Sequence, residues 1–146
     1  MPVIHVHDKQ FQPYISQEQI AGKIQEIAFA LEKDYSGKTP LFIAVLNGSF
    51  MFASDLFKAL NMPAEICFIK LASYKGTQSS GHIITSIGLD IDLFGRDVII
   101  LEDIIDTGKT MSQFLPQLLH QQPASLKICT LLHKPQAAIY PVTIDY

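Results

Sequence analysis

The sequence predicts an α/β fold: an open, mostly parallel, twisted sheet with helices on both faces. Three observations lead to this prediction. Strand-like apolar runs alternate with helical patterns, which is typical of βαβ units with right-handed crossovers. Residues 41–46 form a continuous apolar run, as expected of a parallel strand buried on both faces. Another apolar run, residues 98–101, stops at two adjacent carboxylates and leads through a short loop into a helical pattern.

The chain begins with two short predicted strands, residues 3–6 and 11–15, around a polar turn. We expect them to form a small N-terminal hood element. Ser16 and Gln19 then have the spacing of a capping box, which predicts the start of a helix. Apolar residues recur on one face of that helix, at positions 20, 24, 27, 28 and 31.

The remaining elements alternate between strand and helix along the chain. Residues 72–82 form a polar stretch, and a loop of that length is more often functional than a simple connector. In chain order, the predicted elements are strand 41–46, a turn at Asn47-Gly48, helix 49–60, strand 64–71, loop 72–82, strands 82–87 and 98–101, helix 111–120 and strand 126–132.

Composition and charge narrow the class of function. The 146 residues are predicted to form one domain, 1–146, with 48% apolar and 17% charged residues, an ordinary globular composition. A formal charge of -3 and the lack of a basic patch argue against a nucleic-acid partner. No apolar run approaches the ~20 residues that span a bilayer, and no secretory signal is evident. The expected location is therefore cytoplasmic, with no membrane partner.

Neither the cysteine pair nor the histidine pair predicts a functional site. Cys67 and Cys129 both lie in apolar, strand-like runs, and we expect buried thiols in a reducing compartment rather than a disulfide. His5 and His7 share one face of a predicted strand, but a zinc site needs a third or fourth ligand and none is evident. The histidine pair alone therefore does not predict a zinc site.

The most informative segment joins residues 98–101 to the next predicted helix. Glu102 and Asp103 end the apolar run, and a short loop follows them. A helix N-terminus after a strand binds phosphate in open α/β sheets, because its N–H groups are free and its dipole favours anions. Carboxylates suit sugar hydroxyls and a divalent cation instead. Together these groups fit a phosphorylated ribose.

The sequence Gly108-Lys109-Thr110 also resembles the end of a nucleoside-triphosphate loop, G-x-x-x-x-G-K-[ST]. That motif needs a second glycine at the position of Asp103, so that backbone amides can wrap the phosphates. The charge of Asp103 would repel phosphate, which argues against a triphosphate-binding loop.

Residues 102–110, Glu-Asp-Ile-Ile-Asp-Thr-Gly-Lys-Thr, resemble the ribose-phosphate signature of the type I phosphoribosyltransferases. Within that family, these residues are most similar to the signature of the branch acting on 6-oxopurines, the hypoxanthine-guanine phosphoribosyltransferases. Three further places agree in order and spacing. Asn47-Gly48 resembles the pyrophosphate-binding turn, Ser73-Tyr74 resembles the start of a mobile lid, and Lys134 resembles the strand-end lysine that contacts the purine. The resemblance runs from about residue 11 to the C-terminus.

The resemblance implies a Rossmann-like fold and a purine salvage reaction. The enzyme would move phosphoribose from 5-phosphoribosyl-1-pyrophosphate to hypoxanthine or guanine, with Mg²⁺ as cofactor, giving IMP or GMP and pyrophosphate. The family also forms homodimers and homotetramers, so we expect one of these. The residues do not decide between hypoxanthine, guanine and xanthine.

The resemblance also implies roles for the matched residues. Glu102 and Asp103 would contact the ribose hydroxyls, directly or through Mg²⁺. Asp106 would face N7 of the purine, as the catalytic proton acceptor or as a hydrogen-bond partner, and Lys134 would donate to the 6-oxo group. The residues implied in ribose and phosphate binding are Glu102, Asp103, Asp106, Thr107, Gly108, Lys109 and Thr110.

Each assignment has a simpler alternative. Asp106 could only cap the following helix, since Asp is a preferred cap. Asn47-Gly48 is a common turn dipeptide, and Ser73-Tyr74 and Lys134 could simply be solvated. Neighbouring acids would raise the pKa of Asp106 and Lys109 would lower it, so the sequence leaves the direction open.

Two features depart from the family pattern. Asn47 stands where the family commonly has lysine or arginine. In the family, a segment after the equivalent of Asp145-Tyr146 carries a purine-stacking aromatic, backbone groups that read the purine edge and an acid that helps to hold magnesium. The sequence ends before that segment, so we expect a domain without it. A second hypothesis is therefore a catalytically weak nucleotide-binding or regulatory module with the same fold.

Overall fold

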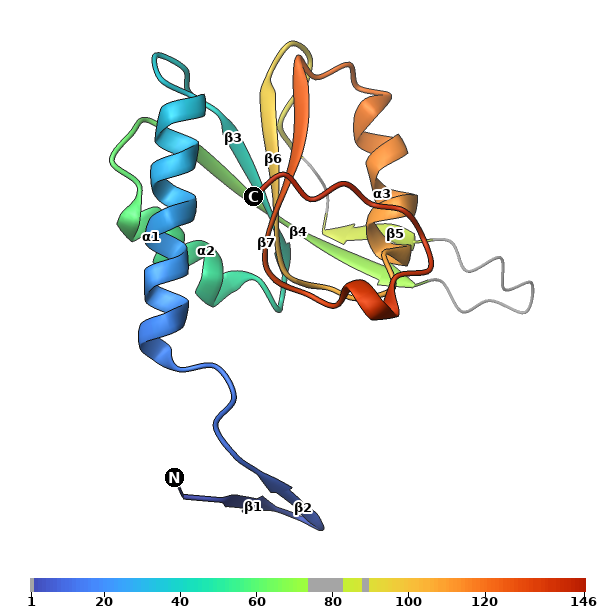
Figure 1. The fold of residues 1–146 in the computed structure, drawn as a ribbon. Helices are drawn as coiled ribbons and strands as arrows, with labels where there is room; N and C mark the ends of the chain where they lie inside the picture. The colour runs from blue at the N-terminus through green and yellow to red at the C-terminus, as the bar shows by residue number, and fades with distance from the viewer. Residues whose placement is uncertain (1, 74–82, 88–89) are drawn as a thin grey trace, which may run out of the picture.

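The computed structural model describes residues 2–73, 83–87 and 90–146. Its main sheet has five strands in the order β5-β4-β3-β6-β7 (Figure 1). β3 (Leu41–Leu46), β4 (Glu65–Ser73), β6 (Asp97–Ile105) and β7 (Ser125–His133) run parallel, and β5 (Ile83–Ile87) pairs antiparallel with β4. The predicted open, mostly parallel sheet is confirmed.

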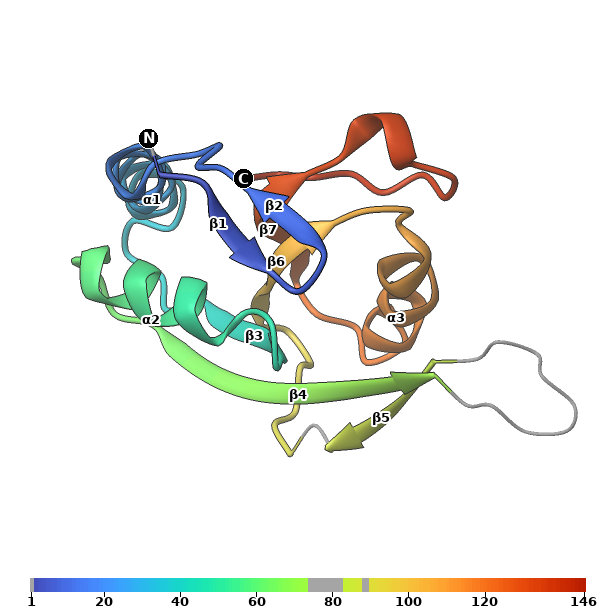
Figure 2. The ribbon, with the colours of Figure 1, turned by 90° about the horizontal axis from the view of Figure 1, so that it is seen from below.

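Helices cover both faces of this sheet, as predicted (Figure 2). α1 (Gln17–Asp34) and α2 (Phe50–Ala59) pack on one face, where their apolar side chains share a core with Phe42 and Leu101. α3 (Lys109–Leu119) packs on the other face, against a second core that contains Ile43 and Ile100. Neighbouring residues of one strand thus serve different cores, which is why residues 41–44 are apolar without interruption.

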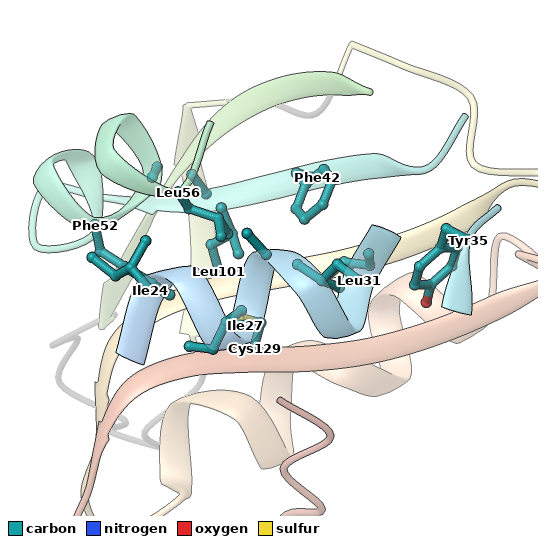
Figure 3. Packing of buried hydrophobic residues seen from close by; sticks show 13 residues of the cluster. Ile24, Ile27, Leu31, Tyr35, Phe42, Phe52, Leu56, Leu101 and Cys129 are labelled. Carbon is teal, nitrogen blue, oxygen red and sulfur yellow. The ribbon is translucent and has the colours of Figure 1, made fainter. Parts of the chain in front are cut away.

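The helix starts and the core follow local sequence rules. Ser16 Oγ accepts the Gln19 N–H at 3.1 Å and Gln19 Oε1 accepts the Ser16 N–H at 2.8 Å, so the predicted capping box is present. The buried stripe of α1 includes Ile27 and Leu31, which belong to the same core as Phe42, Leu101 and Cys129 (Figure 3). Phe42 meets Phe57 edge to face, with ring centroids 5.1 Å apart.

Both cysteines are free thiols, as predicted. Cys129 is buried in the core under α1 and α2, whereas Cys67 is half-buried against the core under α3. Burial raises the pKa of Cys129 to about 12, and it also raises the pKa of Cys67. Since the two thiols lie on opposite faces of the sheet, they cannot form a disulfide with each other.

The N-terminal hairpin differs in part from the prediction. β1 (Ile4–Val6) lies where a strand was expected, but β2 is Lys9–Phe11 rather than residues 11–15. Ile4 pairs with Phe11 and Val6 with Lys9, which leaves a two-residue turn in which His7 has φ +54°. The turn is thus tighter than the polar run suggested. The hairpin projects from the end of the molecule where the parallel strands finish (Figure 1).

The largest correction concerns β6. The sequence predicted a strand over 98–101 that ends at Glu102, but β6 continues to Ile105 because it pairs with β7 up to Ile105 opposite His133. Its pairing with β3 stops earlier, at Leu101 opposite Ala44. Glu102 and Asp103 therefore lie where β6 parts from β3, not where the strand ends.

The chain after β7 forms a 3-10 turn, η1 (Pro135–Ala137), and then returns along the sheet as residues 138–146, which we call the C-terminal segment (Figure 1). Val142 and Ile144 pack on the core under α3. At its end, the Tyr146 N–H donates to Ile128 O at 3.1 Å and Tyr146 O accepts the Thr130 N–H at 3.1 Å, so Tyr146 pairs with β7 in parallel. None of the helices in the described ranges is long and apolar enough to cross a membrane.

Candidate functional site

The sheet topology has a switch point between β3 and β6. β3 leads through α2 to β4 on one side, whereas β6 leads through α3 to β7 on the other. The connections after these two neighbouring strands thus diverge, which is the topological switch point where open α/β sheets bind ligands. All residues that the sequence matched to ribose, phosphate and pyrophosphate binding follow or end these two strands.

The turn after β3 contacts the acidic pair of β6. The Leu46-Asn47 peptide at this turn is cis. A Cβ atom added to Gly48 would lie 2.5 Å from Asp103 Oδ2 and 2.8 Å from Asp103 Cγ. The absence of a side chain at Gly48 therefore lets the Asp103 carboxylate rest directly against the turn. Gly48 and Asp103, which are far apart in the sequence, thus lie side by side at the switch point.

Glu102 is the buried member of the acidic pair, with only 8% of its surface exposed. Its pKa is raised to about 8, mainly by burial and further by the charge of Asp103 and a hydrogen bond with it. A proton thus remains on Glu102 near neutral pH when nothing positive is bound beside it. A divalent cation or a set of hydroxyl donors would favour the ionised form instead.

The loop after β6, residues 106–110, together with the end of β6, surrounds a cavity of about 110 Å³. Gly108 caps α3 with φ +84°, a conformation that favours glycine. The Lys109 N–H donates to Thr107 Oγ1 at 3.3 Å. The cavity is lined by Glu102, Ile104, Ile105, Asp106, Thr107, Gly108, Lys109, Thr110 and Met111. The structure therefore gathers every residue of the 102–110 signature except Asp103, which faces Gly48.

Asp106 and Lys134 meet across the ends of β6 and β7. Lys134 Nζ lies 4.0 Å from Asp106 Oδ2, and both side chains are about half exposed. The Lys134 N–H donates to Ile105 O at 3.0 Å, which fixes the backbone of the two strand ends. The helix cap is Gly108, so the alternative in which Asp106 only caps the helix is wrong. An exposed ion pair at this distance contributes little stability, so Asp106 and Lys134 can separate to meet a ligand.

Not every predicted site residue is described. Ser73 is the last residue of β4, and its side chain lies outside the described residues, as does Tyr74. Their role in a lid stays a prediction. Among the described residues there is no group of three His, Cys, Asp or Glu that could hold a metal, so no third ligand joins His5 and His7.

The sequence did not indicate that the C-terminal segment contacts the phosphate loop. Ile139 N–H and Tyr140 N–H both donate to Thr107 O, at 3.0 and 2.9 Å. These are backbone contacts between distant parts of the chain, and no side-chain pattern signals them.

Comparison with known proteins fits this geometry. A family model for the phosphoribosyl transferase domain matches residues 14–146. The chain belongs to the phosphoribosyltransferase family. The hypoxanthine-guanine phosphoribosyltransferase of Lactococcus lactis is 41% identical over 133 residues, which cover 90% of this chain and 72% of the relative. The hypoxanthine-guanine-xanthine phosphoribosyltransferase of Tritrichomonas foetus is 43% identical over 132 residues, again 90% of this chain and 72% of the relative.

Solved structures agree with the fold of this phosphoribosyltransferase. A crystal structure of a Bacillus anthracis hypoxanthine-guanine phosphoribosyltransferase superposes with a TM-score of 0.87 at 36% identity, covering 93% of this chain and 81% of that one. The predicted type I phosphoribosyltransferase fold is thereby confirmed.

Proposed function

We propose that this phosphoribosyltransferase catalyses purine salvage, transferring phosphoribose from 5-phosphoribosyl-1-pyrophosphate to a 6-oxopurine, either hypoxanthine or guanine. The products are IMP or GMP and pyrophosphate. The observation that carries the proposal is the placement of the acidic pair on β6 at the switch point, where Glu102 lines the phosphate-loop cavity and Asp103 contacts the turn after β3. The names of the two relatives described above support the purine as acceptor. They do not favour the alternative of a regulatory module without turnover.

Different residues of the site bind different parts of the substrate. Thr107, Gly108 and Thr110 lie at the N-terminus of α3, where free N–H groups and hydroxyls hold the 5′-phosphate. Asn47-Gly48 faces the pyrophosphate. Glu102 and Asp103 hold the ribose 2′- and 3′-hydroxyls.

The bond between C1 and the pyrophosphate oxygen breaks with positive charge developing on the ribose ring. Carboxylates beside the ring stabilise that charge. Asp106 accepts the proton of the purine or a hydrogen bond from it, and Lys134 donates to the 6-oxo oxygen.

We also propose Mg²⁺ as cofactor. Glu102 and Asp103 offer the hard oxygen ligands that Mg²⁺ prefers. A cation bound beside them would offset the burial and the charge of Asp103, which together raise the pKa of Glu102. When bound, Mg²⁺ neutralises the leaving pyrophosphate.

We further propose that the chain acts in the cytoplasm, as the free thiols suggest, and as a homodimer or homotetramer. Exposed apolar residues support self-association, among them Phe50, Met51 and Phe68. Sedimentation velocity would test the oligomer, and a monomer at micromolar concentration would contradict it.

The function is tested with the purified chain, 5-phosphoribosyl-1-pyrophosphate, Mg²⁺ and each 6-oxopurine in turn. We expect nucleotide and pyrophosphate in equal amounts, and no product when Mg²⁺ is chelated. Asp106→Asn is expected to lower kcat, since the amide cannot accept a proton from the purine. Donor binding without any product would point to the binding module instead, and unchanged turnover by Asp106→Asn would exclude the proposed role of Asp106.

A further inference from the structure

The C-terminal segment holds one carbonyl of the phosphate loop. Thr107 O accepts two N–H groups, from Ile139 at 3.0 Å and from Tyr140 at 2.9 Å. A carbonyl has two lone pairs, so both are used. The candidate cavity, by contrast, is lined only by residues between 102 and 111. The segment therefore touches the loop without entering the cavity.

Because the peptide bond is planar, this contact also sets the direction of the Gly108 N–H. Leu46-Asn47 is the only cis peptide among the described residues, so the Thr107-Gly108 peptide is trans. In a trans peptide the C=O and the N–H point in opposite directions. Because the Thr107 carbonyl points at the segment, the Gly108 N–H must point away from it. Among the described residues, this N–H has no hydrogen-bond acceptor.

The packing leaves little room for the peptide to turn. A Cβ atom on Gly108 would lie 2.5 Å from Tyr140 O and 3.1 Å from Val142 Cγ2. Val142 in turn packs on the core under α3. Gly108 thus contacts the C-terminal segment and is at the same time the N-cap of α3.

The far end of the segment is fixed to two other elements. Asp145 Oδ2 accepts the Ile128 N–H at 2.9 Å, and Lys127 Nζ lies 3.7 Å from Asp145 Oδ1. The Tyr146 hydroxyl donates to Asp34 Oδ2 at the C-terminus of α1, at 2.5 Å. A segment held at both ends can keep the Thr107 carbonyl in place.

We propose that the C-terminal segment is a positioning element, which fixes the Thr107-Gly108 peptide so that the Gly108 N–H is aimed at the 5′-phosphate of the substrate. The inference rests on the proposed function for its ligand. A free loop would have to select this orientation on binding, at a cost in affinity.

Ile139 is well suited to a test, because it contributes to the contact only through its backbone N–H. Its side chain is 73% exposed, and Ala138 before it has φ -63° and ψ 124°, which a following proline accepts. Ile139→Pro removes the N–H that Thr107 O accepts. Ile139→Ala shortens the same side chain and keeps the N–H, so it is the matched control.

Binding of ribose 5-phosphate is measured by calorimetry on both variants, below the melting temperature of each. We expect Ile139→Pro to raise the Kd about tenfold, the effect of one lost hydrogen bond, and Ile139→Ala to stay within about twofold of wild type. In turnover, the proline should raise the donor KM more than it lowers kcat. Equal Kd values for the two variants, whether changed or unchanged, would overturn the proposal.

The wild-type chain provides a second measurement that needs no variant. If the segment orders the loop for binding, the ligand must in return stabilise the segment. Ribose 5-phosphate is therefore expected to slow amide hydrogen exchange at Ile139 and Tyr140, and unchanged exchange at saturating ligand would contradict the proposal.

Failure of the proposed function would be recognised separately, as wild-type protein that neither binds ribose 5-phosphate nor turns over. The orienting role would then be decided by ligand-free crystal structures of the two variants. A turned Thr107-Gly108 peptide in Ile139→Pro alone would support the role, and an unchanged peptide would overturn it.

Discussion

Gly48 has no room for a side chain, because the Asp103 carboxylate occupies the space where a Cβ would lie. We predict that Gly48→Ala displaces Asp103 and lowers kcat/KM about tenfold or more, since small misplacements of a binding group are costly. Gly22→Ala is the matched control, because nothing lies within 4 Å of a Cβ at Gly22. Steady-state kinetics with both variants checks this, and wild-type kcat/KM in Gly48→Ala would contradict it.

Glu102 makes stability depend on pH. Its pKa is about 8 in the folded chain and 4.5 in the unfolded reference, so the folded state binds more protons between these values. The free energy of unfolding contributed by Glu102 therefore falls as pH rises from about 4.5 to about 8, and is constant above that range.

We predict that Glu102→Gln removes this decline, which amounts to up to about 5 kcal/mol. Urea unfolding at several pH values measures the difference from wild type. Glu26→Gln, on an exposed position of α1, controls for the loss of one carboxyl. Parallel stability curves for wild type and Glu102→Gln would show that the Glu102 carboxyl does not titrate in this range.

The elements differ in how far their own residues determine them. α1 starts with a reciprocal capping box, which the spacing of Ser16 and Gln19 in the sequence predicted. We predict that Ser16→Ala lowers the free energy of unfolding by about 1 kcal/mol, because the Gln19 N–H loses its acceptor. Ser54→Ala, at an exposed site inside α2, is the control and should be neutral or slightly stabilising. Denaturation midpoints of the two variants compare these effects, and equal midpoints would refute the cap.

β3 and β6 show what the sequence can and cannot predict. β3 was predicted with its observed bounds, Leu41–Leu46, because burial on both faces leaves a continuous apolar run. The end of β6 was placed too early, because its last residues are held by β7, which lies later in the chain. The order of residues in the sequence was enough to predict the acidic pair and the loop. The contact of Gly48 with Asp103, and that of Thr107 with the C-terminal segment, depend on tertiary packing and could not be predicted in this way.

The whole molecule is stabilised by two cores that share one sheet. Phe42 is fully buried between α1, α2 and the sheet (Figure 3). We predict that Phe42→Ala lowers the free energy of unfolding by about 3–5 kcal/mol through loss of apolar burial and the cavity that remains. Phe29→Ala, with a side chain 72% exposed, should cost far less. Urea denaturation compares them, and similar losses would mean that the core repacks around the gap.

The contact between Gly48 and Asp103 also limits how the two positions can diverge during evolution. A larger residue in the turn demands a shorter one on β6, and a mutation at one site is tolerated only with a matching change at the other. Since one position faces the leaving group and the other the sugar in the proposed reaction, substrate range cannot be broadened at one end without altering the other. Directed evolution of this protein would therefore do better to vary both codons in one library than to scan them singly.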